Sequence, residues 1–511
     1  MIDKILKGTV AVFSNSLLTS ILALSLVPLI LSAYGPEKYG LIVLTVFLSV
    51  RNGILGIFIF GVQSAIIKFV AEYNAKEDYS KVSKLLGTSF LFYVTVSTLV
   101  VIILAVSKRW LFGSFFNLPP LLVEGYLDAF NYVLASIFFQ FFSLIFLGYF
   151  EGLHQFFISK VIDSLSYLAY FLCVLLCLFF GFGYVEIVKL LGLMHVFTFL
   201  LCLIFFRLQK GRCVPSFSFD KTLQVGWLRF CIALFSNSIA AIAYQHSPKL
   251  LITTLLSPSA LAIYDIVSKV PATVKSIIGL GNRVIVPTAS ELLVKIGVDA
   301  NTQLFTLGLK INLLVFVPFV TALIVLSENL LLIWVGSEYV EFAYLMQMLF
   351  WVPLLSIFMS FGFAIFLGEN YRLRIIPIFG WSILILSLLY WYFLIESDGL
   401  YGIVAGRVFG LAVTAPIAMC LFFKHFKVAY VNFTLRIVAL ASLAFVPVLL
   451  KNIGFTLFRF ESILTFLLLF SVLYFSYAGA IYLTVLDRIE RALVANTLIR
   501  IRSNLVARIR R

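Results

Sequence analysis

Apolar runs, each about 20 residues long and ended by a short polar turn, follow one another along almost the whole chain. A helix of that length crosses the hydrocarbon core of a bilayer. The composition agrees, since 62% of the 511 residues are hydrophobic, only 12% are charged, and the mean hydropathy is +1.10. A water-soluble domain carries roughly 25% charged residues. The sequence therefore predicts an all-α polytopic membrane protein.

The apolar runs predict about fourteen transmembrane helices when they are read with the usual window for membrane spans. Their predicted ranges are 10–33, 39–64, 86–107, 127–149, 158–180, 185–206, 229–255, 260–285, 304–326, 341–367, 373–395, 399–423, 434–450 and 462–485. The first range is too long for the apolar core of a signal peptide, so we expect it to be a retained helix.

The loops between the spans differ strongly in charge. With Met1 inside, the loops on the cytoplasmic side carry most of the 38 Lys and Arg residues, as membrane proteins require. The opposite loops carry only five basic residues, which are Lys38, Lys108, Arg109, Lys451 and Arg459. The alternation predicts that both termini are cytoplasmic. The net charge of +15 is thereby explained by membrane topology, and we expect no nucleic-acid partner.

An internal repeat divides the chain. Residues 11–16 match residues 233–238, 222 positions later, and Pro36 falls on Pro258 at the same offset. The two copies are six spans apart and share one orientation, which predicts two parallel six-helix lobes around a central cavity. The expected parts are an N-terminal lobe, a C-terminal lobe, an extra helix pair and a basic cytoplasmic tail, at 1–212, 213–428, 429–486 and 487–511.

Several ionisable residues lie inside the predicted spans, where a charge is expensive and usually faces a cavity or a partner. His246 and Asp265 are candidates for ion coupling, and Pro248 should open or kink the helix that carries His246. In the alternative interpretation, Asp265 and Lys269 form a self-satisfied i,i+4 pair and the other lysines snorkel. The residues expected to line a cationic cavity for an anionic headgroup are Arg51, Lys249, Lys269 and Lys275.

Motifs for catalysis or metal binding are absent from the sequence. It contains neither a phosphate-binding Gly-x-x-x-x-Gly-Lys-Ser/Thr loop nor a His-Glu-x-x-His motif. The six cysteines lie within or beside apolar runs without an accompanying cluster of histidines or carboxylates. We therefore expect a protein that is not an enzyme and that needs no metal and no cofactor.

Two segments resemble motifs of bacterial polysaccharide flippases. The segment Tyr34-Gly35-Pro36-Glu37-Lys38-Tyr39-Gly40 is similar to their Gly-Pro-x-x-Tyr-Gly hairpin. Residues 60–73 are similar to their Gly-x-x-x-Ala-x-x-Arg-x-x-Ala-Glu pattern, with Lys68 in place of the usual Arg. In the second half, residues 261–264 and 287–292 resemble the Gly-x-Tyr and Pro-x-x-Ser segments, although Ala262 replaces the usual Gly.

The resemblance implies the polysaccharide transport family, whose members include O-antigen and capsule oligosaccharide flippases of the multidrug/oligosaccharidyl-lipid/polysaccharide exporter superfamily. Such a protein moves undecaprenyl-pyrophosphate-linked oligosaccharides across the bacterial cytoplasmic membrane by alternating access, for O-antigen, capsule or exopolysaccharide synthesis. A polysaccharide polymerase and chain-length proteins are expected partners. The alternatives are a cation-coupled multidrug exporter of the same superfamily, a lipid II flippase, and a non-transporting scaffold of a polysaccharide assembly complex.

Overall fold

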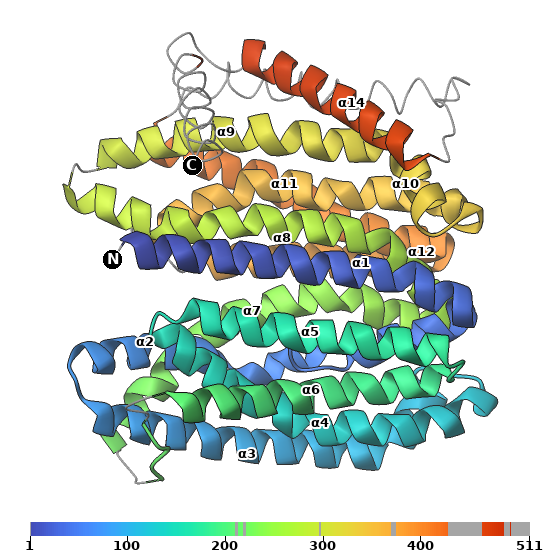
Figure 1. Cartoon of the computed structure of the whole chain (residues 1–511). Helices are drawn as coiled ribbons and strands as arrows, with labels where there is room; N and C mark the ends of the chain where they lie inside the picture. The colour runs from blue at the N-terminus through green and yellow to red at the C-terminus, as the bar shows by residue number, and fades with distance from the viewer. Residues whose placement is uncertain are drawn as a thin grey trace, which may run out of the picture. The chain divides into compact units, whose positions relative to one another are not determined.

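The computed structural model describes residues 2–209, 213–217, 221–295, 298–368, 375–427, 462–484 and 491, and every regular element within these ranges is a helix (Figure 1). The elements are α1 (Ile2–Phe47), η1 (Ile54–Ile59), α2 (Val62–Ala75), α3 (Tyr79–Trp110), η2 (Leu111–Phe115), α4 (Pro120–Gly152), α5 (Phe156–Phe179), α6 (Tyr184–Leu208), α7 (Lys221–Leu255), α8 (Pro258–Lys295), α9 (Val298–Val325), α10 (Ser327–Trp334), η3 (Ser337–Phe342), α11 (Ala343–Gly368), α12 (Ile375–His425) and α14 (Ile463–Thr484).

Among the described residues, 11 helical segments are long and apolar enough to cross a membrane, which confirms the predicted all-α membrane architecture. The total of about fourteen stays a prediction. The span expected at 434–450 lies outside the described residues, as does the tail expected at 487–511 apart from Arg491. Helices α7 and α8 are not among the 11, and these two carry Lys249, Asp265 and Lys269.

Two long helices each join two predicted spans across a glycine. In α1 the backbone turns at Gly35, where φ is 76°, and in α12 it turns at Gly399, where φ is 52°. Glycine adopts positive φ readily because it has no Cβ. These two glycines therefore place the turns between the spans, which the sequence predicts as separate helices.

The predicted span at 39–64 is interrupted, so the prediction of one continuous helix there is wrong. Helix α1 ends at Phe47, and non-helical backbone over residues 48–53 precedes η1 and α2. Asn52 and Gly53, two residues that favour turns, lie at the end of this break. By contrast, α7 remains helical through Pro248, where the sequence predicts an opening or a kink.

Side chains of neighbouring helices satisfy the interrupted backbone. The amide of Val50 donates to Oε1 of Gln140 on α4 at 2.9 Å, and the hydroxyl of Tyr93 on α3 donates to the carbonyl of Ile59 at 3.1 Å. Non-helical backbone within a membrane is tolerated only where the protein supplies such partners or the segment lines a cavity. The break is therefore a stable part of the fold, and hydrogen bonds from side chains of α3 and α4 support it.

The chain divides into two compact units, residues 1–269 with 380–407 and residues 270–379 with 408–511. Within the first unit, α3, α4 and α6 lie side by side (Figure 1). Helix α4 is surrounded by other parts of the protein. In its most apolar stretch 78% of the residues are buried, whereas the figure for α5 is 22%. Within the second unit, α9 packs against α11 and α14. The predicted lobe boundaries stay a prediction.

The turns that begin the second span of each repeat copy are in direct contact. A Cβ built on Gly40 would lie 2.0 Å from the carbonyl oxygen of Pro258, at the start of α8. Only glycine allows the two backbones to approach this closely. Gly40 corresponds to Ala262 in the repeat, so the first copy has the smaller residue at the point of contact.

We predict that Gly40→Ala lowers the melting temperature of the purified protein in detergent by several degrees. The added methyl group meets backbone, and overpacking of this kind costs about 1–3 kcal/mol. Gly125→Ala on α4 is the matched control, because a Cβ there has no neighbour within 4 Å. Equal melting temperatures for the two variants would show that the contact with Pro258 is unimportant.

Candidate functional site

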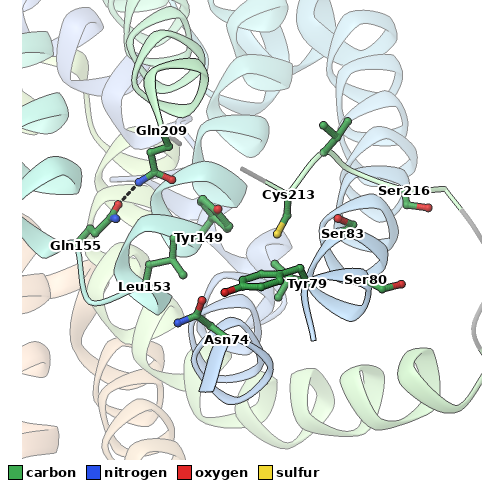
Figure 2. A pocket seen from close by; sticks show the side chains of 12 residues that line it. Asn74, Tyr79, Ser80, Ser83, Tyr149, Leu153, Gln155, Gln209, Cys213 and Ser216 are labelled. Atoms are coloured by element: carbon green, nitrogen blue, oxygen red, sulfur yellow. Dashed lines mark hydrogen bonds between the residues drawn. The ribbon is translucent and has the colours of Figure 1, made fainter. Parts of the chain in front are cut away.

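A large pocket lies where the ends of α2, α3, α4 and α6 meet the segment that follows α6. It encloses about 920 Å³, and Figure 2 shows the side chains that line it. The amide of Ser216 donates to the carbonyl of Ser83 at 2.8 Å, which holds this segment against α3. Among the residues that the structure describes, the lining is uncharged and consists of Asn74, Tyr79, Ser80, Val82, Ser83, Tyr149, Leu153, Gln155, Gln209, Cys213, Val214 and Ser216. Its size makes it a candidate binding site.

A buried cluster of charges lies on α7 and α8. Lys249 Nζ is 2.7 Å from Asp265 Oδ1, and Lys269 Nζ is 2.9 Å from Asp265 Oδ2. The side chain of Asp265 is 10% exposed, against 18% for Lys249 and 28% for Lys269. One carboxylate therefore serves two lysines through its two oxygens. The structure brings together three of the predicted site residues, and the cluster keeps a formal charge of about +1 when all three are ionised.

Tyr39 completes the cluster from α1. Its hydroxyl donates to Asp265 Oδ2 at 2.8 Å and accepts from Lys269 Nζ at 3.2 Å. Tyr39 is the tyrosine of the Gly-Pro-x-x-Tyr-Gly segment, so the sequence singles out this residue but not its partners. A polar side chain from the first repeat copy thus fixes the orientation of the charged groups of the second.

A cavity adjoins the cluster. It has a volume of about 80 Å³, and Tyr39, Asp265, Lys269, Tyr167 and Tyr170 contribute to its lining along with aliphatic residues of α1. A single water needs about 10–15 Å³ on a comparable measure. The cavity therefore has room for a few water molecules beside the charges, but the headgroup of a glycolipid does not fit in this conformation.

Arg51, a predicted member of the cationic set, lies in a different network. It is placed in the break after α1, and its Nη2 is 2.7 Å from Asp163 Oδ1 on α5. Lys160 Nζ lies 3.5 Å from Asp163 and 3.0 Å from Glu151. Asp163 cannot be identified as the partner of Arg51 from the sequence alone, because the two residues are 112 positions apart. Arg51 is thus locally compensated and supports the break in the backbone.

The other predicted residues are placed as follows. His246 lies on α7 and is 7% exposed, with its ring centre 6.0 Å from that of Phe47. Its Nδ1 has no hydrogen-bond partner in the part of the chain that the structure describes. Lys275 lies on α8 beyond the boundary of the first unit, so its position relative to the cluster is not assigned.

We predict that Asp265→Ala lowers the melting temperature markedly, because it leaves two partly buried lysines without their carboxylate. Breaking a buried ion pair in this way costs about 3–5 kcal/mol. The triple variant Lys249→Met, Asp265→Leu, Lys269→Met should recover most of the loss, since apolar replacement of a whole buried network is often neutral.

Glu186→Gln is the control, because its pair with Lys189 at 2.8 Å is more exposed and should matter little. The assignment of Asp265 as the common counter-ion is contradicted if Asp265→Ala melts like this control.

Comparison with known proteins identifies a family and a fold for the chain. The sequence model of a family described as "Polysaccharide biosynthesis protein" matches residues 5–293, which is more than half of the chain. No curated protein matches the sequence. Solved structures do match in fold, although their sequences have diverged widely.

An inward-facing multidrug resistance MATE family transporter of the MOP superfamily has a TM-score of 0.68 at 15% identity, covering 82% of this chain and 94% of that one. The lipid II flippase MurJ, in an inward closed conformation, also has a TM-score of 0.68, at 12% identity, covering 94% of this chain and 100% of that one. These matches show the fold. The family match and the shared fold together confirm the predicted resemblance: the chain belongs to the polysaccharide biosynthesis protein family, and its fold is that of the MATE and MurJ structures.

Proposed function

We propose that the protein is a flippase that moves lipid-linked oligosaccharides, joined to undecaprenol through a pyrophosphate, across the bacterial cytoplasmic membrane. The observation that carries the proposal is the excess of positive charge in the buried cluster, where Lys249 and Lys269 share the single carboxylate of Asp265. A pyrophosphate diester carries about two negative charges, and opposite charges attract strongly where water is scarce. Lys249 and Lys269 would bind its oxygens.

The counter-ion in the cluster would keep the two lysines charged within the membrane while no substrate is bound. Two ammonium groups without a counter-ion would be costly within a membrane. Asp265 compensates them, and the hydroxyl of Tyr39 holds the carboxylate in place at 2.8 Å. A pyrophosphate would compete with Asp265 for the same lysine donors. The long prenyl tail would stay in lipid, so only the headgroup needs a polar path.

The transport cycle in this proposal is alternating access, in which the predicted lobes at 1–212 and 213–428 rock against each other. Both termini would be cytoplasmic, as the positive-inside bias predicts. The substrate would undergo no chemical change. A polysaccharide polymerase and chain-length proteins would use the exported units, for O-antigen, capsule or exopolysaccharide. His246 and Asp265 remain the candidates for coupling transport to an ion gradient.

The competing function is cation-coupled export of drugs, which the similarity to multidrug resistance transporters supports. Cationic drugs favour carboxylates in the cavity, whereas here two lysines surround the one carboxylate of the cluster. A lipid II flippase is the other alternative, supported by the match to MurJ, and it needs the same cationic site. In a non-transporting scaffold, the charged cluster of Lys249, Asp265 and Lys269 would have no role in binding a substrate.

We predict that Lys249→Gln/Lys269→Gln strongly reduces surface polysaccharide in cells and causes the lipid-linked precursor to accumulate in the cytoplasmic leaflet. The double substitution leaves Asp265 in place and removes both groups that would bind the phosphates. Precursor on each face can be measured by its accessibility to an added glycosidase.

Lys189→Gln is the matched control, because Lys189 pairs with Glu186 away from the cluster and is expected to be dispensable. Normal export by a well-expressed double variant would rule out the cationic site. Loss of drug resistance with unaltered surface glycan would favour the multidrug exporter instead.

A further inference from the structure

Arg407 on α12 is a buried cation without a carboxylate partner in the part of the chain that the structure describes. It is 9% exposed, and none of the Asp and Glu side chains that the structure describes lies within 4.0 Å of its guanidinium. Its Nε is buried and has no hydrogen-bond partner within the described ranges. The contacts that it does make are with tyrosines, because its Nη1 donates to the hydroxyl of Tyr264 and its guanidinium carbon lies 5.6 Å from the ring centre of Tyr244.

Other buried cations of the same unit are treated differently by the fold. Arg51, Lys249 and Lys269 each have a carboxylate oxygen at 2.7 to 2.9 Å. An arginine cannot escape the cost of burial by losing its proton, because its pKa is too high. An ionisable residue that is retained in a membrane span at such a cost is by default a candidate functional residue.

We propose that Arg407, held by Tyr244 and Tyr264, is a second oxyanion-binding subsite for an anionic group of the ligand, closed in the conformation described here. The planar guanidinium presents parallel N–H donors, which match two oxygens of a carboxylate or phosphoryl group. Tyr264 takes one end of the fork through Nη1, and the buried Nε has no hydrogen-bond partner among the described residues, so an anion would bind along the Nε edge once the surrounding helices part. The hydroxyl of Tyr244 donates to the carbonyl of Arg407 at 2.9 Å and anchors the backbone.

The subsite belongs to the same pair of helices as the lysine cluster. Tyr264 directly precedes Asp265 on α8, and Tyr244 lies five residues before Lys249 on α7. Together, Lys249, Lys269 and Arg407 outnumber Asp265 by two positive charges. One ligand with two anionic groups could therefore engage both sites, either through two phosphoryl groups or through a phosphoryl group and the carboxylate of an acidic sugar. The natural ligand rests on the proposed function, but anion binding does not.

Thermal unfolding of the purified full-length protein in neutral detergent tests the subsite. Arg407→Gln should leave the melting temperature without ligand unchanged or higher, because it removes an uncompensated charge. The wild type should be stabilised by inorganic pyrophosphate, by glucuronate, or by both, but not by glucose. In Arg407→Gln the effective anion should need at least a tenfold higher concentration for half of that stabilisation.

Arg51→Gln is the matched control. It should lower the melting temperature without ligand, since Asp163 loses its partner, and should keep the response to anions. A loss of the pyrophosphate response in Arg407→Gln assigns the subsite to phosphoryl groups, and a loss of the glucuronate response assigns it to acidic sugars. Arg407→Lys keeps the charge without the fork and should recover only part of the response.

The proposal is overturned if Arg407→Gln destabilises the protein as Arg51→Gln does while its anion response is retained, since Arg407 would then be a structural link between helices. It is also overturned if neither anion stabilises the wild type. A failure of the proposed function would look different, because anions would still bind while Lys249→Gln/Lys269→Gln left glycolipid export intact.

Discussion

The ion pairs between Asp265 and the two lysines are the interaction on which the functional account depends. Exposed pairs of this kind contribute about 0–1 kcal/mol, but here burial makes each partner expensive to leave alone. Asp265 stabilises Lys249 and Lys269 together, and Tyr39 holds it in position. In the proposed function, the surplus positive charge that results is what favours an anionic group at this place in an otherwise apolar chain.

The fold handles buried cations in three ways, and the differences suggest different roles. Arg51 has its own carboxylate, Asp163, and stabilises the segment where the backbone leaves the helix after α1. The two lysines share one carboxylate, which in our proposal competes with the incoming anion. Arg407, on α12, contacts Tyr264 of α8 and Tyr244 of α7, and no described carboxylate pairs with it. The number of carboxylates per cation thus decreases from Arg51, through the lysine pair, to Arg407.

Much of the helical architecture is readable from the sequence, because each span must be apolar over its own length. The pairing of Asp265 with Lys269 is also readable, since their spacing of four residues places them on one helical face. Contacts between distant segments cannot be read from the sequence. Nothing in the local pattern around Arg51 indicates Asp163, and the motif that contains Tyr39 does not reveal that its hydroxyl meets Asp265. The interruption at 48–53 is hidden because its flanks are as apolar as a helix.

The central claim is that the buried cluster selects an anionic headgroup, and movement across a membrane tests it most directly. The purified protein would be placed in liposomes with a fluorescent sugar linked to a short prenyl chain through pyrophosphate, and the dye's exposure to an external quencher would be followed. The account predicts that the wild type speeds movement of this lipid, and that Lys249→Gln/Lys269→Gln loses most of that activity. Equal rates for both proteins, or transport of a cationic dye in place of the glycolipid, would contradict it.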